Sequence, residues 1–190
     1  MSKTPQWREP SALELAFIDS LERYHKKTNR AALAALRRGF GKPPWGAREM
    51  YPYIVPYLPT EGSFHSEEAF FFTGAGFAEY PSLDVSQDIT RARPNIGASL
   101  RRAVLRTEDV MPIERRFVAI LNADREDLTN HLWQIVTFLK YKDMQIDWRQ
   151  FLHDLALPSW DAVRREWAVG FWGPQHDDLA VKREVDAGNV

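Results

Sequence analysis

The chain has 190 residues, 44% of them hydrophobic, which fits one globular domain with a single core. Its lack of cysteine excludes a disulfide framework, a thiolate metal cluster and a cysteine nucleophile, and its formal net charge of -1 differs from that of a uniformly basic nucleic-acid-binding domain. No apolar run reaches the roughly 18 residues that cross a bilayer, and residues 1–10 are polar, so we expect a soluble, cytoplasmic protein without a membrane partner.

Helical periodicity begins at residue 11, and no stretch shows strict apolar alternation. Ser11 and Glu14 have the spacing of a capping box and predict the start of the first helix. Asn29 begins a second helix that should end at Gly39 or Phe40, since strong helix formers fill the positions between. Both segments place apolar side chains on one stripe and therefore predict amphipathic helices.

The middle of the chain contains a connector and a loop. Five prolines between residues 43 and 59 exclude a long helix there, although a short helical turn over 49–57 is compatible with them. A helix should then begin at Ser66 and stop before Pro81. Residues 82–93 have no apolar period, so we expect an exposed loop.

The remaining helices each have a recognisable first turn. Asn95, Asp124, Asp147 and Ser159 precede four of them, and Pro112 lies in the first turn of the fifth. The resulting prediction is an all-α, single-domain helical bundle of about seven or eight helices. We expect a flexible N-terminus over residues 1–10, a helical domain over 11–173 and an acidic tail over 174–190.

Two stretches, 23–42 and 91–106, are rich in basic residues and contain no acid. Their arginines sit beside apolar stripes, and a guanidinium suits phosphate oxygens without reading base sequence. For any single arginine, local ion pairs on a solvated surface, for example with Asp109 or Glu114, are the favoured interpretation, whereas the clusters taken together favour phosphate binding. The predicted nucleic-acid-binding residues are Lys26, Lys27, Arg30, Arg37, Arg38, Arg101, Arg102, Arg106, Arg115 and Arg116.

Aromatic residues are frequent and raise the question of base stacking. Trp148, Trp160 and Trp167 coincide with apolar stripes, which favours a packing role. Two interpretations remain for the aromatics of the connector: they pack it, or they form a surface for a partner protein. These aromatics are Trp45, Tyr51, Tyr53 and Tyr57.

Catalysis finds little support in the sequence. The pairs His153–Asp154 and His176–Asp177 spell the dipeptide of helical metal-dependent phosphohydrolases, but such a site needs further histidine and aspartate ligands. His131 has no acidic partner nearby, and no phosphate-binding glycine loop or nucleophile elbow occurs. We therefore predict neither a catalytic residue nor a metal or cofactor.

Four segments resemble one known family. They are NRAALAALRRGFG from Asn29, IGASLRRAV from Ile96, ERRFVAILNA from Glu114 and IDWRQFLHDLALPSWDAVRREWAVGFW from Ile146 to Trp172. Together they resemble CasB, the small subunit of the type I-E CRISPR Cascade complex. The resemblance spans residues 11–172, and its last segment is the specific part.

The resemblance implies a helical, non-catalytic subunit in antiviral defence. Members of that family occur as paired copies beside the large subunit CasA and the CasC backbone, near guide RNA, target DNA and the displaced non-target strand, where they stabilise the R-loop. The implied contacts are those of the arginines in the first three segments, whereas Lys26, Lys27 and Arg106 come from local charge alone. A purely architectural protein that bridges subunits, and less favourably a His-Asp phosphohydrolase, are the alternatives.

Overall fold

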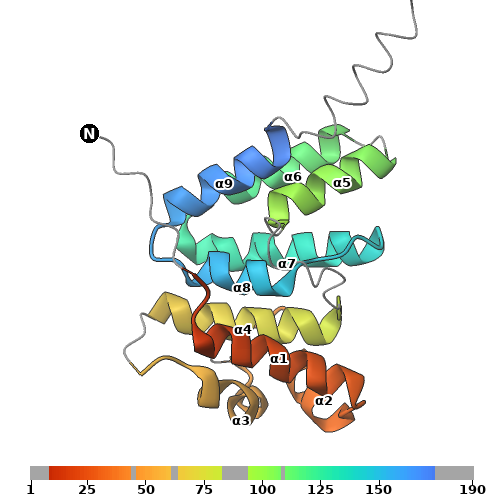
Figure 1. Ribbon diagram of the computed structural model, residues 1–190. Coiled ribbons are helices and arrows are strands. Elements are labelled where there is room, and N and C mark those ends of the chain that lie inside the picture. The colour runs from red at the N-terminus through yellow and green to blue at the C-terminus, as the bar shows by residue number, and fades with distance from the viewer. Residues whose placement is uncertain (1–8, 44–45, 61–63, 83–93, 108–109, 174–190) are drawn as a thin grey trace, which may run out of the picture.

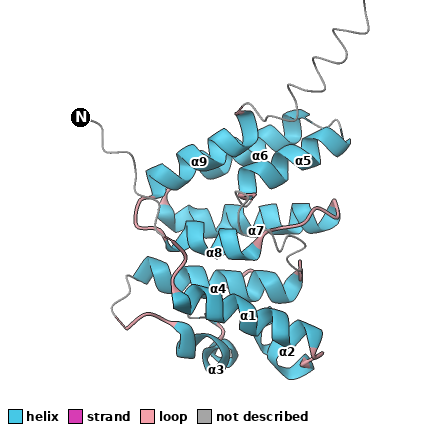
Figure 2. Ribbon diagram, in the orientation of Figure 1, coloured by secondary structure: helices cyan, strands magenta, loops and turns pink. Residues whose placement is uncertain are grey.

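The computed structural model describes residues 9–43, 46–60, 64–82, 94–107 and 110–173. Its α-helices are α1 (Ala12–Lys26), α2 (Arg30–Arg37), α3 (Tyr51–Ile54), α4 (Phe64–Glu79), α5 (Ile96–Thr107), α6 (Val110–Asn122), α7 (Arg125–Tyr141), α8 (Trp148–Ala156) and α9 (Trp160–Trp172). Short 3-10 helices, η2 (Arg48–Met50) and η3 (Val55–Tyr57), flank α3. Within the described ranges no strand occurs (Figure 2), which confirms the all-α class.

Most of the long helices start where the capping residues predict. At α1 the Glu14 amide donates to Ser11 Oγ at 3.2 Å, and the Ser11 amide donates to Glu14 Oε2 at 3.1 Å, which completes the capping box. Each of five other caps accepts a hydrogen bond from the backbone amide three residues later. They are Asn29, Asn95, Asp124, Asp147 and Ser159.

The structure differs from the prediction at two helix ends. Helix α2 ends at Arg37, because the next amides bond to carbonyls three residues back, as in the Gly39-to-Leu36 bond of 3.1 Å, and Gly41 turns away with a φ of 75°. Helix α4 begins at Phe64, two residues before Ser66. The short helical turn that the connector could accommodate is formed by η2, α3 and η3.

Three predicted segments fall wholly or partly outside the description. The flexible N-terminus, the exposed loop and the acidic tail include residues 1–8, 83–93 and 174–190, which the structure does not describe. The described helical part runs from the cap at Ser11 to the end of α9 at Trp172.

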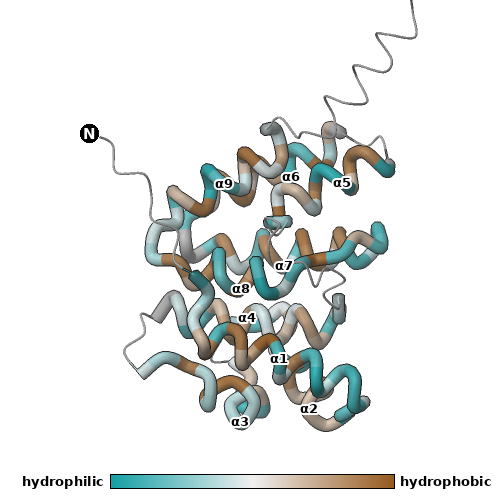
Figure 3. The backbone as a smooth tube through the Cα atoms, viewed as in Figure 1, coloured by the Kyte–Doolittle hydropathy of each residue, from teal (hydrophilic) through white to brown (hydrophobic). Residues whose placement is uncertain are grey.

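The helices lie in three tiers (Figure 1). One tier contains α1, α2, α3 and α4, the middle tier contains α7 and α8, and the opposite tier contains α5, α6 and α9. Helix α8 packs on α4 and α1, whereas α7 contacts α6, α5 and α4, so the middle tier joins the other two. Apolar and polar positions alternate along these helices (Figure 3), as expected of amphipathic helices that share one core.

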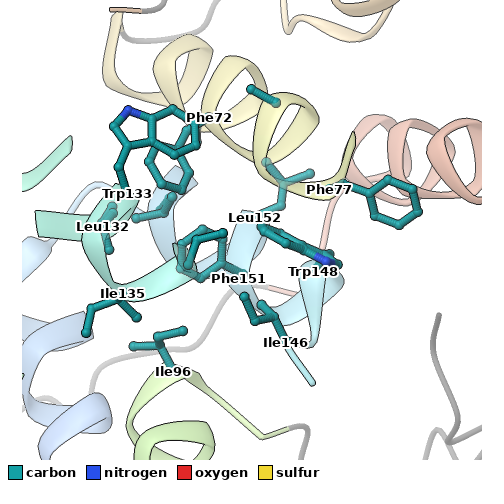
Figure 4. Packing of buried hydrophobic residues seen from close by; sticks show 14 of the residues in the cluster. Phe72, Phe77, Ile96, Leu132, Trp133, Ile135, Ile146, Trp148, Phe151 and Leu152 are labelled. Carbon is teal, nitrogen blue, oxygen red and sulfur yellow. The ribbon is translucent and has the colours of Figure 1, made fainter. Parts of the chain in front are cut away.

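One hydrophobic core runs through all three tiers. The Trp133 and Phe72 rings stack with centroids 3.8 Å apart, and Phe151 lies edge-to-face against Trp148 at 5.6 Å, as the close view in Figure 4 shows. Trp148, Trp160 and Trp167 expose at most 9% of their surface, which confirms their predicted packing role.

Helices α5 and α9 pack closely because each carries a glycine where it faces the other, Gly97 on α5 and Gly170 on α9. A Cβ added to Gly97 would lie 2.0 Å from the Trp167 carbonyl oxygen, and one added to Gly170 would lie 2.3 Å from Asn95 Oδ1. Asn95 Nδ2 also donates to the Glu166 carbonyl at 2.9 Å. The start of α5 is therefore held against the backbone of α9.

Candidate nucleic-acid interface

The ten predicted binding residues form two groups rather than one. Lys26, Lys27, Arg30, Arg37 and Arg38 lie at the end of α1 and on α2, and Arg101, Arg102, Arg106, Arg115 and Arg116 lie on α5 and α6. Figure 1 shows α2 in one outer tier and α5 and α6 in the other. The middle tier therefore separates most members of the two groups.

Arg37 connects the first group to the middle tier. Its Nε and Nη2 donate to the Ala78 carbonyl, at 3.2 and 2.9 Å, near the C-terminus of α4, and Nε lies 3.5 Å from Glu79 Oε2. The other oxygen of that carboxylate accepts from Lys140 Nζ at 2.5 Å. One acid is thus shared by cations from α2 and α7, and the Arg37 side chain remains 52% exposed.

Further cations gather where α7 ends. Arg106 Nη1 lies 3.3 Å from Met144 Sδ and approaches the turn after α7. Arg116 Cζ lies 5.2 Å from the Phe138 ring centroid, and Lys142 Nζ lies 5.9 Å from the same centroid. Guanidinium and ammonium groups at these distances are attracted by the π-face while still facing solvent.

These contacts place five cations from four helices and one turn along one side of the molecule, which we call the cationic edge. Its members are Arg37, Lys140, Lys142, Arg106 and Arg116. The five cations of the edge outnumber the two nearby carboxylates, Glu79 and Asp143. Three of its members belong to the predicted set.

Several predicted residues bond within the protein. Arg101 Nη1 donates to the Phe171 and Gly173 carbonyls at 3.1 and 2.8 Å, which satisfies the C-terminus of α9. Lys26 pairs with Glu22 at 3.0 Å. Arg38 pairs with Glu49 at 3.3 Å, and the pKa of that carboxyl lies below its usual range, chiefly through its own backbone amide and then through Arg38.

Other predicted residues face solvent. Lys27, Arg30, Arg102 and Arg115 are exposed and form no ion pair with another residue of the described ranges. Arg102 precedes Arg106 by four residues on α5, so both lie on one face of that helix. Arg102 is therefore the predicted residue best placed to extend the cationic edge.

Lys140 and Lys142 were not predicted. They lie outside both acid-free stretches, and Asp143 follows them directly. The sequence feature that could have identified them is an aromatic residue flanked by two lysines at the end of an amphipathic helix. Their proximity to Arg106 and Arg116 depends on how α5, α6 and α7 pack, and the chain pattern does not show that packing.

The His153–Asp154 pair is buried and bonded internally. His153 Nδ1 lies 3.3 Å from Glu14 Oε2, and Asp154 accepts hydrogen bonds from Trp167 Nε1 and Gln150 Nε2, both at 2.7 Å. Burial raises the pKa of Asp154 to about 6, and the two hydrogen bonds oppose that rise. The pair is therefore embedded in the core.

The second His-Asp pair, at 176–177, lies outside the described residues. Within the part that the structure describes, no three histidine, aspartate or glutamate side chains form a group that could hold a metal ion. Likewise, no helix in that part is long and apolar enough to cross a membrane.

The aromatics of the connector pack inward. Ring centroids are 5.8 Å apart for Tyr51 and Phe71, and 5.4 Å apart for Tyr57 and Phe17. Tyr53 meets Tyr24 edge-to-face at 5.8 Å, whereas Trp45 lies outside the described ranges. For these three tyrosines the packing interpretation is therefore the better one.

Comparison with known proteins agrees with this architecture. The chain is 29% identical over 179 residues to a CRISPR-associated protein Cse2 of Thermus thermophilus, covering 90% of this chain and 96% of that protein. A crystal structure of CasB from Thermus thermophilus superposes with a TM-score of 0.65 at 27% identity, covering 85% of this chain and 98% of that one.

A chain of a CRISPR RNA-guided surveillance complex superposes with a TM-score of 0.70 at 28% identity, covering 90% of this chain and 99% of that chain. The sequence profile of the family described as CRISPR-associated protein Cse2 matches residues 32–172, which include most of α2 and every helix from α3 to α9. Because the family model matches most of the chain and a solved structure of CasB shares the fold, this protein belongs to the Cse2 family, which confirms the family predicted from its segments.

Proposed function

We propose that this chain is a non-catalytic subunit of an RNA-guided CRISPR surveillance complex and that it grips nucleic-acid backbone through the cationic edge. Support for the assembly comes from the structural likeness to a chain of such a complex. Support for the grip comes from the convergence of cations from α2, α5, α6 and α7 on one side of a protein whose net charge is only -1. That convergence is the observation on which the proposal rests.

Backbone contacts suit the task of such a complex. Invasion of DNA by a guide RNA exchanges one duplex for another of similar stability, so contacts to phosphates can tip the balance without reading sequence. In this proposal the guide RNA reads the target, and this subunit holds the target or displaced strand to stabilise the R-loop. Residues 11–173 carry the role, beside a large subunit, a backbone subunit and a second copy of the chain.

Guanidinium groups on the edge are positioned for this role. Arg116 is held over Phe138, and Arg106 is held at the turn after α7, so each loses little side-chain freedom on binding phosphate. Arg37 keeps half of its side chain exposed although it also bonds to α4. An architectural role through the connector is less well supported, because three of its tyrosines are partly buried and pack against the core.

A salt titration tests the proposal. Binding of a fluorescent single-stranded oligonucleotide by the full chain is measured from low to moderate salt, and each neutralised phosphate contributes a log-log slope of roughly -0.7. The Arg106→Ala/Arg116→Ala variant should reduce the magnitude of the slope by roughly 1.4. A matched variant, Arg48→Ala/Arg165→Ala, removes the same charge from exposed positions on η2 and α9 and should leave the slope unchanged.

If the cationic edge is the binding surface, the edge variant alone should reduce the magnitude of the salt slope. Equal slopes for the edge variant and the matched variant would show that binding depends on overall charge and not on this surface. Absence of salt-dependent binding by the unaltered chain would remove the proposed function itself.

A further inference from the structure

Tyr141 is the most exposed large apolar side chain among the described residues, with 82% of its surface open. It is the last residue of α7 and lies between Lys140 and Lys142, two members of the cationic edge. A single exposed aromatic is ordinary on a protein surface. An aromatic ring set among cations is a different chemical environment, because it offers a π-face beside binding groups for anions.

The backbone beneath this ring is held firmly. The Met144 amide donates to the Leu139 carbonyl at 2.9 Å, and the Asp143 amide donates to the Lys140 carbonyl at 3.1 Å. Asp143 has a left-handed φ of 53°. These bonds form the Schellman pattern of a helix end, with Met144 and Leu139 buried as its hydrophobic contact. Tyr141 therefore projects from a fixed turn.

One cation lies against the ring, and others lie near the turn that carries it. Lys142 Nζ lies 5.7 Å from the Tyr141 ring centroid. The same ammonium and the Arg116 guanidinium both lie over the Phe138 ring, which links Tyr141 to α6. Arg106 reaches the turn from α5. Phosphates on both sides of a nucleotide could therefore be contacted while its base meets the tyrosine.

Nearby carboxylates are already engaged. Glu79 is shared by Arg37 and Lys140. Asp143 lies beside Tyr80, whose pKa is raised by burial and then by this carboxylate. The potential around Tyr141 is therefore positive, which favours an anionic ligand over an apolar protein surface.

We infer that Tyr141 stacks on one unpaired base of a single strand whose phosphates lie along the cationic edge. The inference rests on the proposed function and adds to it that the bound strand is unpaired at this point. Every base has a π-face, so stacking is tolerant of sequence, as a guide-directed complex requires. A base inside a duplex has both faces covered and cannot make the contact.

The test compares Tyr141→Ala with Tyr141→Phe in the full chain. Because the side chain is mostly in solvent, neither change should alter the unfolding transition. Tyr141→Ala should weaken binding of a single-stranded oligothymidine by roughly 5- to 150-fold, the range for loss of one stacked base, with an unchanged salt slope. Tyr141→Phe keeps the ring and should bind like the unaltered chain.

Two further probes separate stacking from charge. An abasic oligonucleotide of equal length should bind the unaltered chain and Tyr141→Ala equally, and so should a blunt duplex. A bromodeoxyuridine-substituted single strand, irradiated on the protein, should form a crosslink at Tyr141.

The outcomes distinguish the two claims. If Tyr141→Ala binds the single strand normally while Arg106→Ala/Arg116→Ala loses its slope, the stacking inference is wrong and the proposed function stands. The same holds if Tyr141→Ala changes only the oligomeric mass of the protein, since the ring would then contact another protein chain. If no strand binds in a salt-dependent manner, both claims fail.

Discussion

Arg101 and Arg102 are adjacent arginines that the structure places in different roles. Arg101 Nη1 donates to two carbonyls at the end of α9, those of Phe171 and Gly173, at 3.1 and 2.8 Å. Arg102 is exposed and forms no ion pair within the described ranges. Replacement of each by alanine removes the same charge from the same helix, so the pair provides its own control.

The expected cost of Arg101→Ala follows from those two bonds. A hydrogen bond from a charged donor contributes about 1.5–3 kcal/mol, and one nitrogen shared by two acceptors contributes less than two separate bonds. The positive charge also interacts favourably with the C-terminus of α9, by about 0.3–1 kcal/mol. We therefore expect Arg101→Ala to lower the free energy of unfolding by about 2–4 kcal/mol, and Arg102→Ala to change it by less than about 0.5 kcal/mol.

Urea unfolding followed by far-UV circular dichroism measures both values. The same proteins are then titrated with single-stranded DNA, where Arg102→Ala should reduce the salt slope by roughly 0.7 and Arg101→Ala should not change it. If both variants are equally stable, Arg101 does not hold the end of α9. If Arg101→Ala alone reduces the salt slope, the assignment of roles is reversed.

Three further changes test the packing, the turns and the buried acid. Gly97→Ala should destabilise the fold by at least about 1–3 kcal/mol, because its Cβ would lie 2.0 Å from the Trp167 carbonyl oxygen; an unchanged melting temperature would refute the close crossing of α5 and α9. Thr28→Gly should raise the free energy of unfolding by about 0.5–1 kcal/mol, since Thr28 has a φ of 51° at the end of α1 and a β-branched residue is strained there; a loss of stability in the same urea assay would contradict this. Burial raises the pKa of Asp154 from 3.8 to about 6, so the native state holds this proton more tightly than the unfolded chain does. Its contribution to stability should therefore fall by an amount on the order of 3 kcal/mol as pH rises from below about 4 to above about 6. Asp154→Asn should remove that part of the pH dependence, because the Gln150 amide can rotate to bond to either oxygen or nitrogen of the new side chain. Identical profiles of stability against pH for the unaltered chain and the variant would show that the Asp154 carboxyl does not titrate over this range.

Local sequence patterns predicted most of the secondary structure. A cap such as Ser11 or Asn95 bonds to an amide three residues away, so its effect depends only on neighbours in the chain. Helix ends were predicted less well, as at Arg37, because the last turn can close with either of two hydrogen-bond patterns of similar energy. The core tryptophans were predicted for the same local reason, since an apolar stripe must be buried.

The candidate site divides in the same way. Arg37, Arg106 and Arg116 were predicted from charge, but Lys140, Lys142 and Tyr141 join them only where α4, α5, α6 and α7 meet. Arg101 had the same local signature as Arg102, and only the carbonyls of α9 distinguish the two. The burial of His153 against Glu14 likewise joins residues far apart in the chain.

By itself, the sequence determined that the chain is helical, where its helices start, which faces are buried and to which family it belongs. These properties depend on side chains within about one or two helical turns of each other, or on segments that can be compared directly. Only the tertiary structure decided which arginines face solvent and which bond to a helix end, and which lysines and aromatics share the cationic edge. The reason is physical: electrostatic and stacking interactions depend on distance in space, and packing of helices brings together groups that no local pattern relates.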